Sequence, residues 1–179
     1  MIEVEAKIKI KSPKEVRSKI SKLAKYNGRE KKIDTYYTLE PLSTYPKKSL
    51  RVRQKPRYYE INFKQNISYK KGVHAKNEVE FILSDISNFL LLIKEFGFKP
   101  WVKKEKITYL YQIKENFNIE LNHVKKLGWF LEVEYLATKK NIKKARKEVA
   151  KMVKVLGFSD KDIVKNGYTK MLWNLKKSN

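Results

Sequence analysis

Apolar and charged residues alternate at the start of the chain, and the same alternation returns in later segments. Between residues 2 and 8, Glu3, Glu5 and Lys7 alternate with four aliphatic residues. Successive side chains of a strand point to opposite faces, so this spacing predicts a strand with one charged and one apolar face. Similar patterns predict further strands at residues 30–40, 50–54, 59–64, 77–81, 98–113, 118–122 and 130–135.

Helical spacing of apolar residues predicts three longer helices, over residues 13–26, 84–97 and 138–157, and two short ones at 159–166 and 168–175. Ser12 and Glu15 favour a capping box at the first helix, and Asn27-Gly28 favours its end. Ser84 is the predicted cap of the second helix. Residues 41–48 and 66–72 are predicted to be loops, the second of them mobile and basic.

The charged strand faces fall into an acidic and a basic set, and the opposite faces are almost wholly apolar. An open sheet with its charged face in water and helices on its apolar face would satisfy this pattern. A closed barrel with its charged face inside and its helices outside would satisfy it equally. Buried charges are costly unless they are paired, so the barrel requires a wet interior that binds cations and phosphates.

Composition narrows the function classes. The chain has 179 residues, 41% of them hydrophobic, and a net charge of +23, which predicts one domain and anionic partners such as nucleic acid, phosphorylated small molecules or an anionic membrane surface. Because it has no cysteine, disulfides and thiolate chemistry are excluded. No apolar run has membrane-spanning length, and we expect a cytoplasmic protein. The two histidines, His74 and His123, form no zinc motif, and no glycine-rich phosphate loop occurs.

An ordered set of motifs resembles the CYTH superfamily, or triphosphate tunnel metalloenzymes, which includes class IV adenylyl cyclases and thiamine triphosphatases. The first strand resembles its E-x-E-x-K signature, and residues 127–134 resemble its L-G-x-F-x-E-x-E segment. The other matching segments are Asp34-Thr35-Tyr36-Tyr37, Leu50-Arg51-Val52-Arg53, Phe63-Lys64, Lys104-Glu105-Lys106 and Gly167-Tyr168. The resemblance covers nearly the whole chain, so we expect a single CYTH-like domain over residues 1–179.

The resemblance implies an α+β fold, an eight-stranded antiparallel β-barrel with helices packed outside, which holds a triphosphate in its tunnel. It implies Mg²⁺ or Mn²⁺ bound by Glu3, Glu5, Glu132 and Glu134, and catalysis by Glu5, Lys7, Glu132 and Glu134. The triphosphate would be held by Lys7, Arg51, Arg53, Lys64, Lys104 and Lys106, with the two arginines offering planar forks to phosphate oxygens. Glu78, Glu80, Glu120 and Asn122 are candidates for supporting the metal ligands through contacts outside the metal site. For Glu78 and Glu80 two alternatives stay open: they pair with the cationic side chains of the tunnel, or they lie on the strand surface. Tyr36, Tyr37 and Trp129 are interpreted as packing residues, and the lysines of the third helix as a solvated face.

Three departures from the family pattern bear on function. The cyclase pattern has His-Phe a few residues before E-x-E-x-K, and its absence here favours a triphosphatase. Asn122 stands where many members carry an aspartate near the metals, and Gly167 stands where a serine is common.

We therefore expect a metal-dependent triphosphatase acting on ATP, thiamine triphosphate or inorganic triphosphate. The alternatives are an adenylyl cyclase that makes cyclic AMP from ATP, a degenerate triphosphate binder, and, from another class, a non-catalytic polyanion-binding or nucleic-acid-binding module. We expect neither a membrane nor a nucleic acid as the main partner, and the sequence leaves the oligomeric state open.

Overall fold

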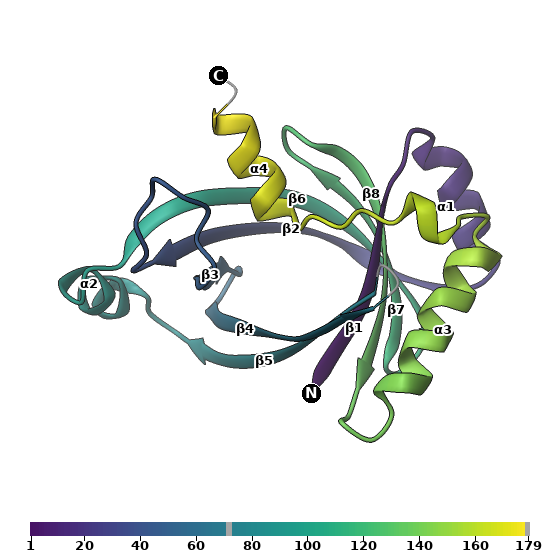
Figure 1. Cartoon of the computed structure of the whole chain (residues 1–179), viewed down its shortest axis with the longest axis horizontal. Coiled ribbons are helices and arrows are strands. Elements are labelled where there is room, and N and C mark those ends of the chain that lie inside the picture. The colour runs from purple at the N-terminus through teal and green to yellow at the C-terminus, as the bar shows by residue number, and fades with distance from the viewer. Residues whose placement is uncertain (71–72, 178–179) are drawn as a thin grey trace.

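Eight antiparallel strands form a closed barrel in the computed structural model, in the order β1-β5-β4-β3-β2-β6-β7-β8 (Figure 1). The structure describes residues 1–70 and 73–177, with only the backbone described for residues 64–70 and 73–78. The barrel closes where β1 pairs with both β5 and β8. The strands are β1 (Ile2–Lys9), β2 (Lys25–Thr38), β3 (Leu50–Gln54), β4 (Tyr59–Lys70), β5 (Val73–Leu83), β6 (Lys99–Lys114), β7 (Phe117–Val124) and β8 (Gly128–Ala137).

The charged strand faces point into the barrel, which decides between the two arrangements that the sequence pattern allowed. On β1, Glu3, Glu5 and Lys7 line an internal cavity. The aliphatic residues between them, such as Val4 and Ile8, are fully buried in the core outside the barrel wall. The predicted eight-stranded barrel with external helices is therefore confirmed.

Two helices cover the outer faces of β1, β7 and β8 (Figure 1). They are α1 (Pro13–Ser21) and α3 (Ile142–Val155). Each presents an apolar stripe to the barrel, with Val16 and Ile20 on α1 and Ala145, Val149 and Val153 on α3. Burying these stripes against the aliphatic strand faces forms the largest hydrophobic core of the molecule, because apolar burial is the main stabilising term.

Two further helices lie over other parts of the wall. The helix α2 (Ser87–Glu95) packs near Val52 and Ile61 on β3 and β4 through Phe89 and Leu90. After the short 3₁₀ helix η1 (Asp160–Asp162), α4 (Tyr168–Lys177) packs Leu172 and Trp173 against β6. Among the described residues, every helix is too short or too polar to span a membrane.

The first helix ends earlier than predicted. It stops at Ser21, and Asn27-Gly28 lies inside β2, where the pairing with β6 shifts register between Tyr26 and Arg29. Gly28 has φ 109°, a conformation that glycine adopts without strain. An Asn-Gly dipeptide can end a helix or form a β-bulge. Here it forms the bulge, because the residues on both sides of it pair with β6.

Other predicted boundaries were also wrong. Ser12 precedes α1 but makes no capping hydrogen bond through its side chain. The second helix begins at Ser87, whose backbone N–H donates to Asp85 Oδ1 at 3.1 Å, so Ser84 is not its cap. The predicted loop at residues 66–72 is instead strand up to Lys70 and again from Val73, while residues 71 and 72 lie outside the described part. The backbone groups of polar residues form hydrogen bonds between strands as well as those of apolar residues do, so the polar composition of this segment did not reveal the strand pairing.

Candidate active site

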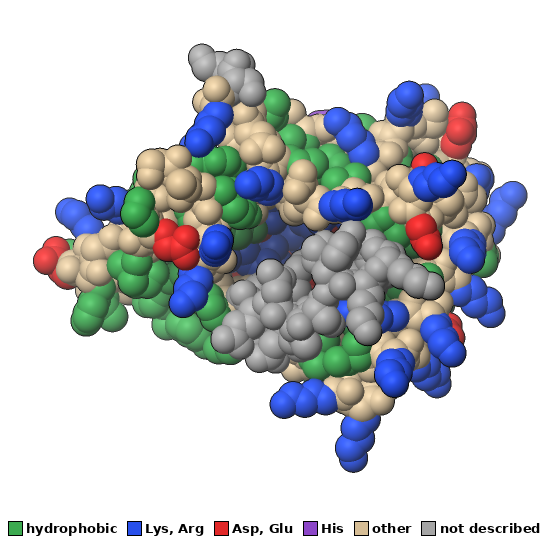
Figure 2. Space-filling model, viewed as in Figure 1, with side chains coloured by type: hydrophobic (Ala, Val, Ile, Leu, Met, Phe, Trp, Pro, Cys, Tyr) green, Lys and Arg blue, Asp and Glu red, His purple; other side chains and the backbone are tan. Residues whose placement is uncertain are grey.

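The barrel holds a cavity of about 500 Å³ that is lined mainly by charged and polar side chains. Figure 2 shows basic side chains in the hollow at the centre of the molecule. Of the described side chains that line the cavity, Val164 alone is aliphatic, and the charged ones comprise seven acids and seven bases. The acids are Glu3, Glu5, Glu60, Glu80, Glu120, Glu132 and Glu134, and the bases are Lys7, Lys32, Lys47, Arg51, Arg53, Lys104 and Lys106.

The wall formed by β1 and β8 is rich in carboxylates. The strand register places Glu5 opposite Glu134 and Lys7 opposite Glu132, with side chains on the cavity side. Lys7 Nζ lies 3.1 Å from Glu132 Oε1. Burial acts to lower the pKa of Lys7, but Glu5 and Glu132 outweigh it and raise that pKa above its ordinary value. Lys7 is therefore a fixed cation within an acidic wall.

A hydrogen-bond network joins β6, β7 and β8 at this wall. Lys106 Nζ lies 2.9 Å from Glu120 Oε2 and 3.4 Å from Glu132 Oε2. The amide of Asn122 donates to the same two oxygens, at 3.1 and 2.7 Å, and its own Oδ1 accepts a hydrogen bond from Thr108 Oγ1 at 2.7 Å. Asn122, which is fully buried and does not itself line the cavity, thus fixes the positions of two cavity carboxylates.

Glu120 receives a second lysine from β2. Lys32 Nζ lies 2.9 Å from Glu120 Oε1, on the other side of the carboxylate from Lys106. Burial acts to raise the pKa of Glu120, but Lys106 and Lys32 outweigh burial and hold that pKa well below its ordinary value. Glu120 is consequently an anion paired with two cations.

The opposite wall is basic and rests on one buried carboxylate. Asp34, which is fully buried, binds Arg53 in a bidentate pair, with Nε–Oδ1 2.7 Å and NH2–Oδ2 3.1 Å. It also binds Lys104 Nζ at 2.9 Å, and Lys104 donates to the hydroxyl of Tyr36 at 2.9 Å. Asp34 therefore fixes the positions of two cationic groups that face the cavity.

Arg51 is less completely paired. Its NH2 lies 3.6 Å from Glu80 Oε2, which also accepts a hydrogen bond from Asn62 Nδ2 at 3.2 Å. The buried Nε of Arg51 has no hydrogen-bond partner within the described part of the chain. A buried N–H without a partner is costly, so this group is a ready donor for an anionic ligand.

Tyr168, the first residue of α4, lines one side of the cavity. The ring of Tyr168 packs edge-on against Phe130 at 4.9 Å between centres, and Lys7 Nζ lies 4.3 Å from its centre. Burial, with added repulsion from Glu132 and neighbouring carboxylates, raises the pKa of Tyr168 well above its ordinary value. Tyr168 therefore remains a neutral phenol beside the charged groups.

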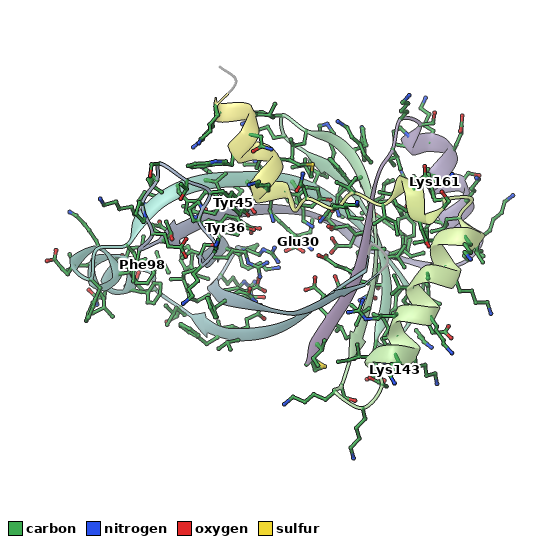
Figure 3. The ribbon with its side chains drawn as sticks, in the orientation of Figure 1. Glu30, Tyr36, Tyr45, Phe98, Lys143 and Lys161 are labelled. Atoms are coloured by element: carbon green, nitrogen blue, oxygen red, sulfur yellow. The ribbon has the colours of Figure 1, made fainter. Side chains whose placement is uncertain are left out.

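The loop between β2 and β3, residues 39–49, also contributes side chains to the cavity near Tyr168. Tyr45 bonds Thr169 through their hydroxyls at 2.9 Å, and Lys47 and Ser49 line the cavity. Figure 3 shows Tyr36, Tyr45 and Glu30 toward the centre of the barrel, whereas Lys143 and Lys161 lie on the outer helical layer.

Most of the residues predicted from the sequence come together in this cavity. Those that line it are Glu3, Glu5, Lys7, Arg51, Arg53, Glu80, Lys104, Lys106, Glu120, Glu132 and Glu134. Asn122 contacts Glu120 and Glu132 from behind. The side chains of Lys64 and Glu78 lie outside the described residues. Tyr36, interpreted as a packing residue, also lines the cavity and contacts Lys104, so that interpretation was incomplete.

Among the charged residues of the site, the sequence analysis gave no role to Lys32, Lys47 and Glu60, which line the cavity, or to the supporting Asp34. Asp34 lay within a motif of the family resemblance, which gave it no role. Glu60 lies in the strand predicted at residues 59–64, but no motif of the family resemblance includes it. Lys32 follows three other charged residues, and Lys47 lies in a loop, so no alternation marked either as facing inward.

The carboxylate wall suits a hard divalent cation that arrives with phosphate. Mg²⁺ is usually bound by one or two carboxylates together with substrate phosphate oxygens, so a complete protein cage is not needed. Among the described side chains, no three carboxylates or histidines gather closely enough to form such a cage. Glu3, Glu5 and Glu134 nevertheless supply oxygen donors from two adjacent strands.

Comparisons with known proteins agree with this fold. A Methanocaldococcus jannaschii protein that carries a provisional name as an adenylate cyclase is 27% identical over 174 residues, covering 96% of this chain and 98% of that protein. The structure of the Pyrococcus horikoshii OT3 protein PH1012 is similar with a TM-score of 0.80 and 29% identity, covering 94% of this chain and 98% of that one.

A more distant structure shows the same fold alone. It is that of the Hippeastrum protein HpAC1, a provisionally named adenylyl cyclase described as revealing a dominant triphosphatase activity. The TM-score is 0.65 at 14% identity, with 98% of this chain and 95% of that one covered. The model of the CYTH domain matches residues 1–168. With its closed barrel and charged interior, the chain belongs to the CYTH family.

Proposed function

We propose that the chain is a divalent-metal-dependent triphosphatase acting on a small triphosphate inside the barrel. The observation that carries this proposal is the balance of seven acids and seven bases among the described side chains that line the cavity. A bare triphosphate would bring several uncompensated negative charges into this balanced interior. The same triphosphate with two divalent cations is close to neutral, and its two kinds of charge match the two kinds of wall.

The basic wall would bind the phosphates. The buried Nε–H of Arg51 has no partner among the described residues, and Arg53 and Lys104 are already positioned by Asp34. Guanidinium groups fit two phosphate oxygens at once, while lysines add point charge. Holding the phosphate chain in a fixed geometry supplies much of the catalysis of phosphoryl transfer, because little covalent chemistry is required of the protein.

The acidic wall would hold Mg²⁺ or Mn²⁺ through Glu3, Glu5 and Glu134, with Glu132 beside them. When bound, the ion would neutralise phosphate charge and supply Lewis acidity. Glu132 is already engaged by Lys7, Lys106 and Asn122. We assign Lys7 to charge stabilisation rather than proton transfer, because its raised pKa keeps it protonated near neutral pH.

The tyrosines around the cavity favour a compact substrate such as inorganic triphosphate. A nucleobase or thiamine ring would need an open aromatic or apolar face. The ring of Tyr168 is occupied by Lys7 and Phe130, and that of Tyr45 by Lys170, whose Nζ lies 4.4 Å from the ring centre. Among the described lining residues, Val164 is the one aliphatic side chain.

Turnover of ATP, thiamine triphosphate and inorganic triphosphate with Mg²⁺ or Mn²⁺ tests the proposal. We expect metal-dependent phosphate release, fastest from inorganic triphosphate, and at least a ~100-fold loss in Glu5→Gln, because the variant lacks one metal-binding charge. Glu15→Gln makes the same change at an exposed position and should keep full activity. Phosphate release that persists in Glu5→Gln would contradict the assignment of this wall.

A second candidate is an adenylyl cyclase, favoured by the provisional name of the Methanocaldococcus jannaschii relative. The ribose 3′-hydroxyl of ATP would then attack the α-phosphorus and pyrophosphate would leave. Cyclic AMP measured in the same reactions separates the two activities. Binding of triphosphate without any product would instead identify a degenerate binder.

A further inference from the structure

The middle of the helix α2, residues 89–93, is wholly apolar although the helix lies on the outside of the barrel. Residues 90–93 are four consecutive aliphatic residues. Ile93 is buried, whereas Leu91 and Leu92 are more than half exposed. Phe96, just beyond the helix, is 70% exposed. Leu91, Leu92 and Phe96 therefore extend the apolar surface of α2 to its solvent side, and a contiguous exposed apolar patch often marks an interaction site.

The exposed apolar surface continues from α2 onto the barrel wall. Glu80 lines the cavity, so its neighbours Val79 and Phe81 point outward, where they are 55% and 47% exposed. The ring of Phe81 lies 6.1 Å from that of Phe89 on α2. We call this surface the α2 face, formed by Val79, Phe81, Phe89, Leu92 and Phe96. Figure 2 shows hydrophobic side chains gathered at this end of the molecule, at the lower left.

The size of the α2 face fits the centre of a protein interface. Its exposed side chains offer on the order of 400 Å² of apolar surface, within the range of the largest patches that monomers carry. That is about half of what one partner buries in an interface of standard size, and a polar rim would supply the rest.

The charge distribution favours a second copy of this chain as the partner. The five side chains of the α2 face carry no charge, although the chain as a whole carries +23. The exposed charges next to it on α2 are Lys94 and Glu95, one of each sign. Around a two-fold axis each copy presents this pair to the other, so opposite charges can meet, and repulsion between more distant lysines is screened by salt. We propose that two copies of the chain associate through their α2 faces.

The mass of the full chain in solution tests this proposal, measured by light scattering and analytical ultracentrifugation from micromolar to several hundred micromolar concentrations. We expect a dimer of the wild-type chain. The double substitution Leu92→Lys and Phe96→Lys should raise its dissociation constant more than ~100-fold, because it places like charges at the interface centre. Both side chains are exposed, so the variant should keep the circular dichroism spectrum and melting temperature of the wild type.

Val155→Lys is the matched control, since Val155 is 51% exposed on α3, away from the α2 face, and it should leave the dimer intact. A wild-type chain that stays monomeric at every concentration would overturn the proposal, as would a dimer that survives the double substitution. A monomer that co-sediments with anionic phospholipid vesicles through Leu92 and Phe96 would assign the α2 face to a membrane surface and would also overturn it.

Discussion

Asp34 is a buried carboxylate on which two cationic groups of the cavity depend. Replacing it with asparagine keeps the shape but removes the charge that Arg53 and Lys104 share. Breaking a buried ion pair from one side typically costs about 3–5 kcal/mol, because it leaves charge uncompensated. We therefore expect Asp34→Asn to lower the free energy of unfolding by about that amount at pH 7, as measured by urea denaturation. Equal stability of variant and wild type would show that Asp34 does not support this wall.

The same carboxylate should contribute to acid sensitivity. Burial acts to raise the pKa of Asp34, but Lys104 and Arg53 outweigh it and lower that pKa strongly in the folded chain. The unfolded chain, with an aspartate pKa of about 3.9, therefore takes up this proton first as the pH falls. The stabilisation is complete above about pH 4 and is lost progressively below it. The free energy of unfolding should fall more steeply below pH 4 in the wild type than in Asp34→Asn.

The substitution Asn122→Asp tests how a single residue supports the carboxylates of the acidic wall. An aspartate there cannot donate to Glu120 and Glu132, and it adds a third negative charge beside them. Without divalent ions, Asn122→Asp should lower the free energy of unfolding by about 1–3 kcal/mol. Mn²⁺ should restore more stability to this variant than to the wild type, because three carboxylates attract a cation more strongly than two.

Thermal unfolding with and without Mn²⁺ measures both effects, and Asn88→Asp on the exposed side of α2 is the control. An unchanged melting temperature without metal would contradict the proposed part of Asn122.

Individual cavity residues were predictable where a strand alternated cleanly. Arg51 and Arg53 alternate with aliphatic residues, so their common face was clear before the fold was known. Lys32 sits among charged residues on both faces of β2, where nothing in the sequence separates inside from outside. Asp34 acquires its role only through Arg53 and Lys104, which come from two other strands.

At the scale of elements, β2 shows how a local signal is decided by long-range pairing. A helix end and a β-bulge both suit Asn27-Gly28, and the choice depends on β6, more than eighty residues later in the chain. The positions of the strands and helices followed from periodicity, but several of their ends did not. Those ends depend on strand partners and on side-chain caps that the sequence shows only as candidates.

Gly28→Ala tests the bulge. Nothing lies within 4 Å of a Cβ added at Gly28, so the cost would come from its φ of 109° rather than from a clash. We expect the free energy of unfolding to fall by about 1–3 kcal/mol, measured by urea denaturation. Gly167→Ala is the control, because Gly167 does not have a positive φ and an added Cβ meets no atom closer than 4.0 Å. If both variants were equally stable, the conformation at Gly28 would not be strained for alanine.

At the scale of the whole molecule, the charge is divided between a balanced interior and a basic remainder. Because the described lining carries equal numbers of acids and bases, the excess of +23 resides elsewhere in the chain. On α3, Lys144, Lys147, Lys151 and Lys154 are exposed at spacings of three and four residues, which places them along one stripe. The lysines that were predicted to form a solvated face, Lys139, Lys140, Lys143, Lys144 and Lys147, are also exposed, although the first two precede α3.

This division of charge predicts two kinds of anion binding, one on the basic exterior and one inside the cavity. The two should differ in their response to salt and to substitutions in the cavity. Binding of duplex DNA, followed by fluorescence anisotropy, should weaken steeply with salt, because it depends on released counterions. It should be unchanged in Glu5→Gln, whose substitution lies inside the cavity. A clear change of DNA affinity in Glu5→Gln would show that the cavity itself takes up the polymer.

The closure of the barrel through β1 has a consequence for how the chain reaches its fold. The partners of β1 on β5 and β8 follow it by roughly seventy and one hundred and thirty residues. Pairings between segments so far apart in the chain make folding slow, because a long loop must be closed before any contact rewards it. During synthesis the first strand leaves the ribosome long before β8 exists. The segment made first must therefore remain without one of its neighbours until nearly three quarters of the chain has followed.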